Sequence, residues 1–239
     1  MVDLTGDSFR DDGRLRDGRG SAIALVSGAA SSRAGRGSGF YRHILKRALD
    51  LLAVAMVALP VLLVVLPLMA LVALDGHSPL FLQKRLGRGG RVFRIVKLRT
   101  MVPDAEAVLQ ATLDSDPEAR AEWDHHQKLS RDPRVTRVGA LLRRTSLDEL
   151  PQLFNVVSGD MSLVGPRPMM PDQRALYPGD EYFEMRPGLT GFWQVSDRHK
   201  TGFAERAAFD RRYHEEMSLL TDIKVMWQTL HVVARGTGC

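Results

Sequence analysis

The chain has 239 residues, of which 44% are hydrophobic and 26% are charged, and its formal net charge is +5. Its one cysteine, Cys239, is the last residue, so an intrachain disulfide is excluded. The excess of positive charge favours anionic partners, such as nucleic acids, phosphates or an acidic membrane surface.

The N-terminal segment is poor in large apolar side chains. Residues 1–39 consist mainly of Gly, Ser, Arg and Asp, and the apolar patch Ala22 to Val26 is too short for a membrane span or a signal core. Such a segment buries too little surface to offset the entropy lost on ordering. We therefore predict a disordered tail over 1–39 and a second short tail over 236–239.

An uncharged apolar run extends from Leu51 to Leu74, which is long enough to cross a bilayer. One interpretation is a plain transmembrane helix. However, Pro60 lies in the middle of the run, where a proline removes a helical hydrogen bond and favours a bend. Lysines and arginines flank both ends of the run, and positively charged flanks stay on the cytoplasmic side of a membrane.

The length of the two arms decides between these interpretations. A helix bent at Pro60 has two arms of about 14 residues, or about 21 Å each, and the hydrocarbon core of a bilayer is about 30 Å thick. We therefore predict a re-entrant membrane helix over 40–75, which enters the bilayer and returns to the same side. Asp50 would lie at the membrane edge, where pairing with neighbouring basic residues would ease its burial.

The pattern changes after the apolar run. The sequence PLFLQKRLGRGGRVFRIVKLRTM alternates apolar and basic residues on both sides of a glycine-rich turn. It predicts a β-hairpin with strands Phe81 to Arg85 and Val92 to Leu98. Lys97 and Arg99 alternate with apolar residues at the end of the second strand, so we expect both on one face, as candidate binding residues.

Helices are predicted in two further regions. Polar helices are expected over 104–130, with Asp116 as an N-cap and Pro117 as the first helical residue. Arg186 to Val195 reads as a Pro-Gly turn followed by a strand or loop, and helices follow from about Phe203 to Ala234.

The last predicted helix carries an apolar stripe. A stripe with this spacing packs either against a protein core or, beside a membrane segment, into the membrane surface, and both interpretations remain open. The stripe consists of Leu219, Ile223, Met226, Leu230 and Val233.

Two adjacent acids, Asp148 and Glu149, follow a pair of arginines. Ser146 and Glu149 match a capping box, but in that frame Pro151 would remove an N–H that has a helical partner. With Asp148 as N-cap, Pro151 falls in the first turn, where no partner is needed. We therefore predict Asp148 as N-cap, with the helix dipole and the arginines keeping its carboxylate ionised.

The sequence GDMSLVGPRP follows, and it holds Arg167 between two prolines. A guanidinium on so rigid a turn loses little backbone entropy on binding, and its planar fork suits a phosphate. Carboxylates, arginines and a divalent cation beside a membrane indicate an aspartate that attacks the phosphorus of a phosphate ester. The alternative is that the acids only cap a helix, which contributes about 1 kcal/mol.

Four blocks of the chain, KRALD, KLRTM, LRRTSLDELPQLFNVVSGDMSLVGPRP and RPGLTGFWQV, resemble the bacterial sugar transferases. These are small monotopic phosphoglycosyl transferases that start exopolysaccharide and O-antigen synthesis, and the resemblance covers about Tyr41 to Ala234. Within the family, the chain most resembles the galactosyl and glucosyl phosphate transferases. The resemblance implies transfer of a sugar 1-phosphate from a UDP-sugar to undecaprenyl phosphate. UMP would be released, by a ping-pong route with Mg²⁺.

The resemblance also implies roles for single residues. Asp148 would be the nucleophile that forms a covalent intermediate. Glu149 would assist by binding metal or handling the acceptor's proton, so both acids are candidate Mg²⁺ ligands. The side chains that would hold phosphates are Lys97, Arg99 and Arg167, with Arg144 as a further candidate.

Two positions depart from the family pattern. The family breaks its membrane helix at a Ser-Pro pair, whereas this chain has Leu59-Pro60 and keeps only the proline. Asp197-Arg198 stands where family members often have Gly-Arg, a region that bears on the choice of nucleotide or sugar.

The expected fold is mainly α with a small β-hairpin. A membrane-embedded helix-break-helix and interfacial amphipathic helices would pack on a cytosolic catalytic core over 76–235, at the cytoplasmic face of the bacterial inner membrane. Whether the chain forms a homo-oligomer is left open. The alternative function is a non-catalytic membrane protein whose basic face binds anionic lipid. Nucleic acid is not an expected partner, because the basic residues flank an apolar span and lack interleaved aromatics.

Overall fold

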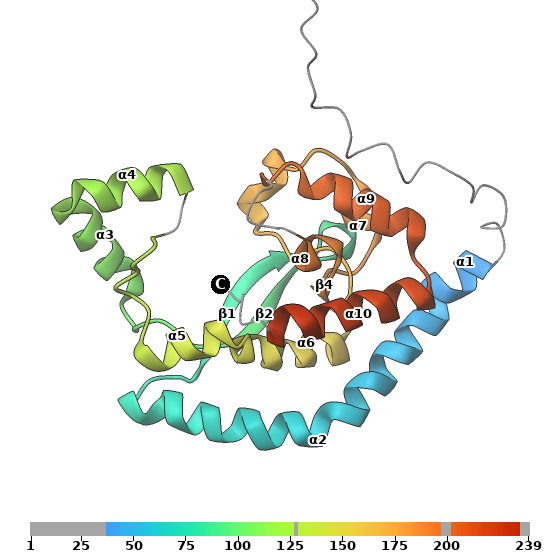
Figure 1. Ribbon diagram of the computed structural model, residues 1–239, viewed down its shortest axis with the longest axis horizontal. Coiled ribbons are helices and arrows are strands. Elements are labelled where there is room, and N and C mark those ends of the chain that lie inside the picture. The colour runs from blue at the N-terminus through green and yellow to red at the C-terminus, as the bar shows by residue number, and fades with distance from the viewer. Residues whose placement is uncertain (1–36, 127–128, 197–201, 235–239) are drawn as a thin grey trace, which may run out of the picture. The chain divides into compact units, whose positions relative to one another are not determined.

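The computed structural model describes residues 37–126, 129–196 and 202–234. Within them the chain is mostly helical and contains two two-stranded sheets (Figure 1). The tails, apart from residues 37–39, and Asp197-Arg198 lie outside the described residues. The shorter helical elements are α1 (Gly37–Phe40), η1 (Tyr41–Leu45), η2 (Ala73–Asp75), η3 (Arg88–Gly90), η5 (Pro171–Leu176), α7 (Glu181–Glu184) and α8 (Phe192–Val195).

The apolar run forms one long helix, α2 (Lys46–Val72), with Pro60 and Pro67 inside it. The helix is continuous, so the expected break at Pro60 into two separate helices is wrong. Figure 1 shows instead that α2 bends along its length. A proline removes one backbone hydrogen bond, and the intact bonds on either side hold the helix together while it bends.

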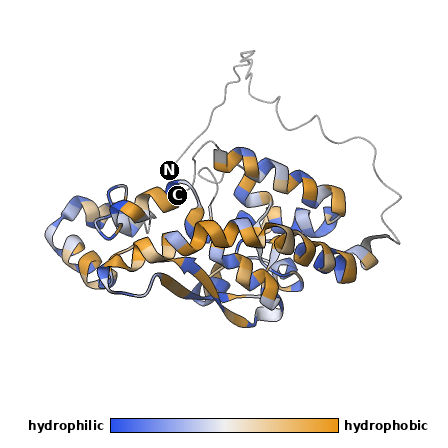
Figure 2. Cartoon of the chain, turned by 90° about the horizontal axis from the view of Figure 1, so that it is seen from below, coloured by the Kyte–Doolittle hydropathy of each residue, from blue (hydrophilic) through white to orange (hydrophobic). Residues whose placement is uncertain are grey.

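Much of the surface of α2 is apolar and exposed. Within the described chain, Tyr41–Asp75 is the one helical stretch long and apolar enough to cross a membrane, judged by length and composition. Figure 2, the view from below, shows orange over much of the helical surface that faces the viewer. Water disfavours so large an apolar surface, which is typical of an interaction site. Its most exposed members on α2 are Leu52, Met56, Leu59, Leu62, Leu63 and Leu66.

The predicted hairpin is confirmed. Strands β1 (Leu80–Leu86) and β2 (Val92–Leu98) pair antiparallel, with Phe81 opposite Lys97. Phe93 and Ile95, two residues apart on β2, are buried, so this face of the strand packs against the core, and Leu98 is buried on the other face at the strand's end. The hairpin thereby fixes which residues of β2 point toward the acidic pair.

A second, parallel pair joins β3 (Ser162–Val164) to β4 (Gly188–Thr190). The two segments approach closely at Gly165 and Gly188, where a Cβ atom on Gly165 would lie 2.4 Å from the Arg186 carbonyl oxygen. Any side chain there would push the segments apart. The glycine of the Gly-Pro-Arg-Pro turn is therefore required for the position of that turn.

The polar helices are also as expected. They are α3 (Ala105–Ser115) and α4 (Pro117–His126), and the Asp116 carboxylate accepts hydrogen bonds from the backbone N–H groups of Glu118 and Ala119. The last helices are α9 (Arg206–Glu216) and α10 (Leu219–Ala234).

Most of the apolar stripe of α10 does not face the core. Leu219, Ile223, Leu230 and Val233 are exposed, and the buried face of the helix is formed by other residues, such as Val225. Met226, the fifth member of the stripe, is partly buried against a core cluster. Most of the stripe therefore does not face the core, and its interfacial placement stays a prediction.

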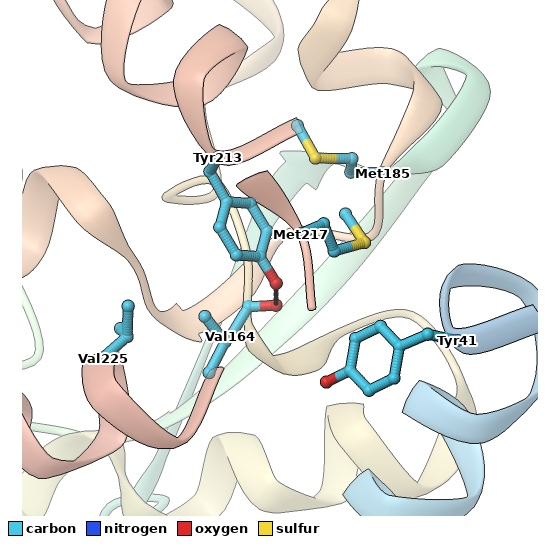
Figure 3. Close-up of a cluster of buried hydrophobic side chains, with 6 residues drawn as sticks. All are labelled: Tyr41, Val164, Met185, Tyr213, Met217 and Val225. Atoms are coloured by element: carbon cyan, nitrogen blue, oxygen red, sulfur yellow. Dashed lines mark hydrogen bonds between the residues drawn. The ribbon is translucent and has the colours of Figure 1, made fainter. Parts of the chain in front are cut away.

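A buried network ties the start of the apolar helix to the C-terminal helices. Asp222 of α10 accepts hydrogen bonds from Tyr41 (2.6 Å), Lys46 (2.5 Å) and Tyr213 (2.7 Å). Figure 3 shows Tyr41 and Tyr213 in the apolar cluster that surrounds these groups. The cluster also contains Val164, Met185, Met217 and Val225.

Asp50 was expected to pair with neighbouring basic residues, but its hydrogen-bond partners are others. Its carboxylate accepts hydrogen bonds from the Ser162 hydroxyl (2.6 Å) and the Leu163 backbone N–H (3.3 Å). The neighbouring Arg47 instead donates to the carbonyl oxygens of Val156 and Val157. Polar contacts with the β3 strand, and not an ion pair, therefore satisfy this acid.

Candidate active site

The acidic pair follows a strained turn. Helix α5 (Arg137–Arg144) ends just before Ser146, which has a φ of 56° and is the only non-glycine residue with positive φ in the described chain. A left-handed conformation costs a serine about 1–2 kcal/mol. Such strain persists only where the surrounding structure imposes it, and it is common at functional sites.

The prediction that Asp148 caps a helix is wrong. Ser146 occupies the cap position, and Asp148 lies within the first turn of a 3₁₀ helix, η4 (Leu147–Gln152). Regular α-helix starts only after Pro151, in α6 (Leu153–Ser158). The left-handed turn at Ser146 starts the helical segment two residues earlier than predicted. Pro151 is accommodated because it lies in a 3₁₀ segment.

Packing against the hairpin holds η4 in place. The start of α5 lies against the end of β2, where a Cβ atom on Gly139 would be 2.0 Å from the Thr100 carbonyl oxygen. The Asn155 side chain reaches β2 as well, accepting from the Val96 N–H (3.0 Å) and donating to the Arg94 carbonyl (2.8 Å). The acidic pair therefore sits on a rigid frame built by β2, α5 and α6.

Asp148 is buried, with 8% of its surface exposed. In the residues that the structure describes, its carboxylate forms no ion pair and accepts no hydrogen bond from another side chain. Burial raises the pKa of Asp148, the positive charges of Lys97 and Arg143 oppose that rise, and Glu149 adds to it. The expectation that its surroundings favour the ionised form is therefore wrong in sign.

Glu149 has a direct partner. The Lys97 ammonium lies 2.6 Å from its carboxylate, and both side chains are partly exposed. The structure thus brings together three predicted site residues, Asp148, Glu149 and Lys97. In this arrangement Lys97 neutralises one acid directly and lowers the pKa of the other through space.

Arg167 lies at the mouth of two adjoining cavities. Both are lined by Arg167, Glu149 and Leu189; the larger has about 500 Å³ and is mostly apolar, and the smaller has about 20 Å³. Lys97 and Gln152 line the smaller one. Asp148 is not among the lining residues of either cavity.

Two predicted residues lie away from this group. The Arg99 guanidinium binds the Asp75 carboxylate through two contacts of 2.7 Å and donates to the carbonyl oxygens of Val72 and Ser78. It thus clamps the end of α2. Arg144 is exposed. Lys97 and Arg99 therefore pair with different acids, Glu149 and Asp75, and their common face stays a prediction.

The structure distinguishes the two arginines before the acids and adds Gln152, which sequence reasoning overlooked. Arg143, and not its neighbour Arg144, exerts its charge on Asp148, and its Nε donates to the Thr100 hydroxyl (2.9 Å). Gln152 lies buried beside the smaller cavity.

The carboxylates fit one kind of metal site. Among the described residues no group of three or more acids, histidines or cysteines comes together, so a closed protein cage for zinc or calcium is not formed there. Mg²⁺ commonly binds through one or two carboxylates together with substrate phosphates and water. Asp148 and Glu149, beside an arginine-lined hollow, suit that mode.

Comparison with known proteins identifies the family of this chain. The pattern that defines the bacterial sugar transferases matches residues 41–236, which is most of the chain. This chain belongs to the bacterial sugar transferase family. The expected resemblance is thereby confirmed over the range that the sequence blocks indicated.

Individual sugar transferases are similar over four fifths of this chain. A UDP-galactose-lipid carrier transferase of Erwinia amylovora is 45% identical, and an undecaprenyl-phosphate galactose phosphotransferase of Salmonella typhimurium is 44% identical. In each case the match covers 82% of this chain but 42% of the relative. The exopolysaccharide production protein ExoY of Sinorhizobium fredii is 43% identical, over 82% of this chain and 88% of its own length.

Proposed function

We propose that this sugar transferase moves a hexose 1-phosphate from a UDP-sugar to undecaprenyl phosphate and so initiates exopolysaccharide synthesis. The names of its relatives support the donor class and the lipid acceptor. The observation that carries the proposal is the Asp148 carboxylate, which is buried without an ion pair in the described chain beside the Glu149–Lys97 pair.

The proposed reaction has two steps that use the same phosphorus. An Asp148 carboxylate oxygen bonds to the sugar-linked phosphorus, and the bond from that phosphorus to the UMP oxygen breaks, so UMP leaves. An oxygen of undecaprenyl phosphate then bonds to the phosphorus, and the bond to Asp148 breaks. The products are the lipid diphosphate sugar and the original carboxylate.

The chain's own charges suit this chemistry. Lys97 and Arg167 would offset the negative charge of the donor phosphates, which would otherwise repel the acid. Burial among fixed charges strengthens these interactions relative to water. Asp148 and Glu149 would hold Mg²⁺, which when bound neutralises phosphate charge and orients the leaving group.

The mechanism is tested by incubating the protein with radiolabelled donor in the absence of lipid acceptor. We expect label to remain on the wild-type chain, at Asp148, and UMP to appear in equal amount. Asp148→Asn should abolish both, lowering turnover at least 1000-fold, because an amide cannot displace UMP. The matched control is Glu118→Gln, an exposed acid on α4, which should behave as wild type.

The same experiment addresses the alternative function. A protein that only binds anionic lipid would release no UMP, and Asp148→Asn would leave its vesicle binding unchanged. Release of UMP at the wild-type rate by Asp148→Asn would disprove the role of Asp148. Kinetics that require donor and acceptor together would contradict the covalent intermediate.

We further propose that α2 is re-entrant at the inner membrane and that the catalytic residues face the cytoplasm. The exposed apolar surfaces of α2 and α10, the basic residues at both ends of α2 and the bend in that helix support this placement.

A further inference from the structure

Three arginines from distant parts of the chain converge beside the candidate active site. Arg85 belongs to β1, Arg167 to the Gly-Pro-Arg-Pro turn and Arg206 to the first turn of α9. An Arg206 N–H donates to the Arg167 carbonyl oxygen at 2.9 Å. The guanidinium groups of Arg206 and Arg167 lie 4.8 Å and 5.9 Å from the ring centre of Trp193.

The charges of this arginine cluster are not balanced within the described chain. None of the three guanidinium groups lies within ion-pair distance of a described carboxylate. The terminal nitrogens of Arg85 donate to the Gln83 side chain (2.5 Å) and the Pro168 carbonyl oxygen (3.5 Å), whereas its buried Nε has no hydrogen-bond partner. The nearby acid Asp210 is engaged by the Tyr177 hydroxyl at 2.8 Å. Asp210 offsets part of the charge of Arg206 through space. Holding three cations together away from water remains unfavourable, so the cluster favours binding of an anion.

The ionisation of the cluster reflects the same imbalance. Burial, followed by the charge of Arg167, lowers the pKa of Arg85 to about 10. Burial also lowers the pKa of Arg206, with Asp210 opposing and Arg167 adding to the effect. Folding therefore holds these groups together against their mutual repulsion.

The cluster borders the acidic pair. Arg85 and Arg167 line the small cavity of about 20 Å³ together with Lys97 and Glu149. Arg206 is 7% exposed and lies behind Arg167. A hollow of this size has room for about one water-sized group, so a phosphate would lie mainly in the adjoining cavity of about 500 Å³, which Arg167 and Glu149 also line.

We infer that Arg85 and Arg206, together with Arg167, form a phosphate-binding cluster for a ligand with more than one negative charge. The inference rests on the proposed function and adds two residues to it. Guanidinium forks bind phosphate oxygens in pairs, and Trp193 provides a flat surface that fixes their orientation. The ligand is either the diphosphate of the nucleotide donor or the phosphate of the lipid acceptor.

Calorimetry on the purified full chain in detergent tests the cluster directly, with inorganic pyrophosphate and UDP as probes. The variants Arg85→Met and Arg206→Met keep much of the buried stem but remove the charge. We expect each to bind both probes at least tenfold more weakly than wild type. Arg85→Lys, which keeps the charge, should recover part of the loss and thereby shows that folding is intact.

Arg91→Met is the matched control. Arg91 lies on the same hairpin, is exposed and pairs with Asp160 at 2.5 Å. We expect it to bind the probes as wild type does. Unchanged affinity in both Arg85→Met and Arg206→Met would overturn the inference.

Kinetics separate the two sources of phosphate. A higher KM for UDP-sugar alone assigns the cluster to the donor, and a higher KM for undecaprenyl phosphate in vesicles alone assigns it to the acceptor; both results support the inference. If the wild-type chain transfers no sugar but binds pyrophosphate through Arg85, the proposed function is disproved, while the phosphate-binding role of the cluster is supported.

Discussion

Ser146 sets the direction of the chain just ahead of Asp148 and Glu149. Its left-handed backbone is tolerated by glycine and is especially unfavourable for a β-branched residue. We expect Ser146→Val to lower the free energy of unfolding by about 2 kcal/mol and to reduce UMP release. Ser146→Gly should keep both near wild type, because glycine relieves the strain while adding flexibility to the unfolded chain.

Thermal denaturation in detergent and UMP release measure these two effects. The control is Ser115→Val, since Ser115 is an exposed serine in the last turn of α3 with ordinary helical geometry. It should cost much less than Ser146→Val. Equal costs at the two serines would show that the left-handed turn stores no strain.

For single residues, the sequence predicted which residue types form the site better than it predicted their geometry. Lys97, Asp148 and Glu149 do come together. The sequence did not reveal that Arg99 would be taken by Asp75 or that burial would raise the pKa of Asp148. Both depend on contacts between segments distant in the chain, which spacing along one element does not encode.

Among the elements, α9 carries a buried acid with a marked pH dependence. Asp210 is almost fully buried, and burial raises its pKa from 3.8 to about 6, while Tyr177 and Arg206 oppose the rise. Between these values the unfolded chain releases the proton and the folded chain keeps it. Stability from this group is therefore full below about pH 4 and is lost as the pH rises through about 6.

The variant Asp210→Asn isolates that contribution, because its amide oxygen still accepts from the Tyr177 hydroxyl. We expect the unfolding free energy of wild type minus that of the variant to fall by about 2 kcal/mol between pH 4 and pH 7, at about 1.36 kcal/mol for each pKa unit. Urea denaturation in detergent at each pH gives both values. A difference that stays constant with pH would show that Asp210 titrates normally.

Element prediction succeeded where local chemistry decides the outcome. The hairpin strands and the Asp116 cap follow from alternation and capping residues, and both are confirmed. The cap at Asp148 failed because Ser146 adopts a conformation that no local preference favours. The side of α10 that faces the core is set by Asp222, whose three buried partners come from α9 and from the start of the apolar helix.

For the whole molecule, the central question is how α2 meets the membrane. Its 27 residues span about 40 Å when straight, enough to cross, so length does not decide between a spanning and a re-entrant helix. The bend and the anchoring of both ends are the observations on which the proposed re-entrant placement rests. Lys46 and Asp50 are buried against α10 and β3, which fixes the start of α2 on the catalytic core, and Arg99 fixes its end to the turn before β1. A single core therefore holds both ends, which supports the proposed re-entrant placement.

This argument predicts the labelling of single cysteines in a Cys239→Ser background, using a maleimide that does not cross membranes. Gly39→Cys, where a Cβ atom meets open space, and His77→Cys flank the helix on exposed positions. Both should react only after the cells are permeabilised. Met56→Cys, in the exposed apolar surface of α2, should resist even then, because the bilayer covers it. Labelling of one flank in intact cells would establish a spanning helix, and rapid labelling of Met56→Cys would place α2 in water. Either result would disprove the proposed membrane placement, which rests on the two anchored ends of one bent helix. The catalytic proposal, which rests on Asp148, would be unaffected.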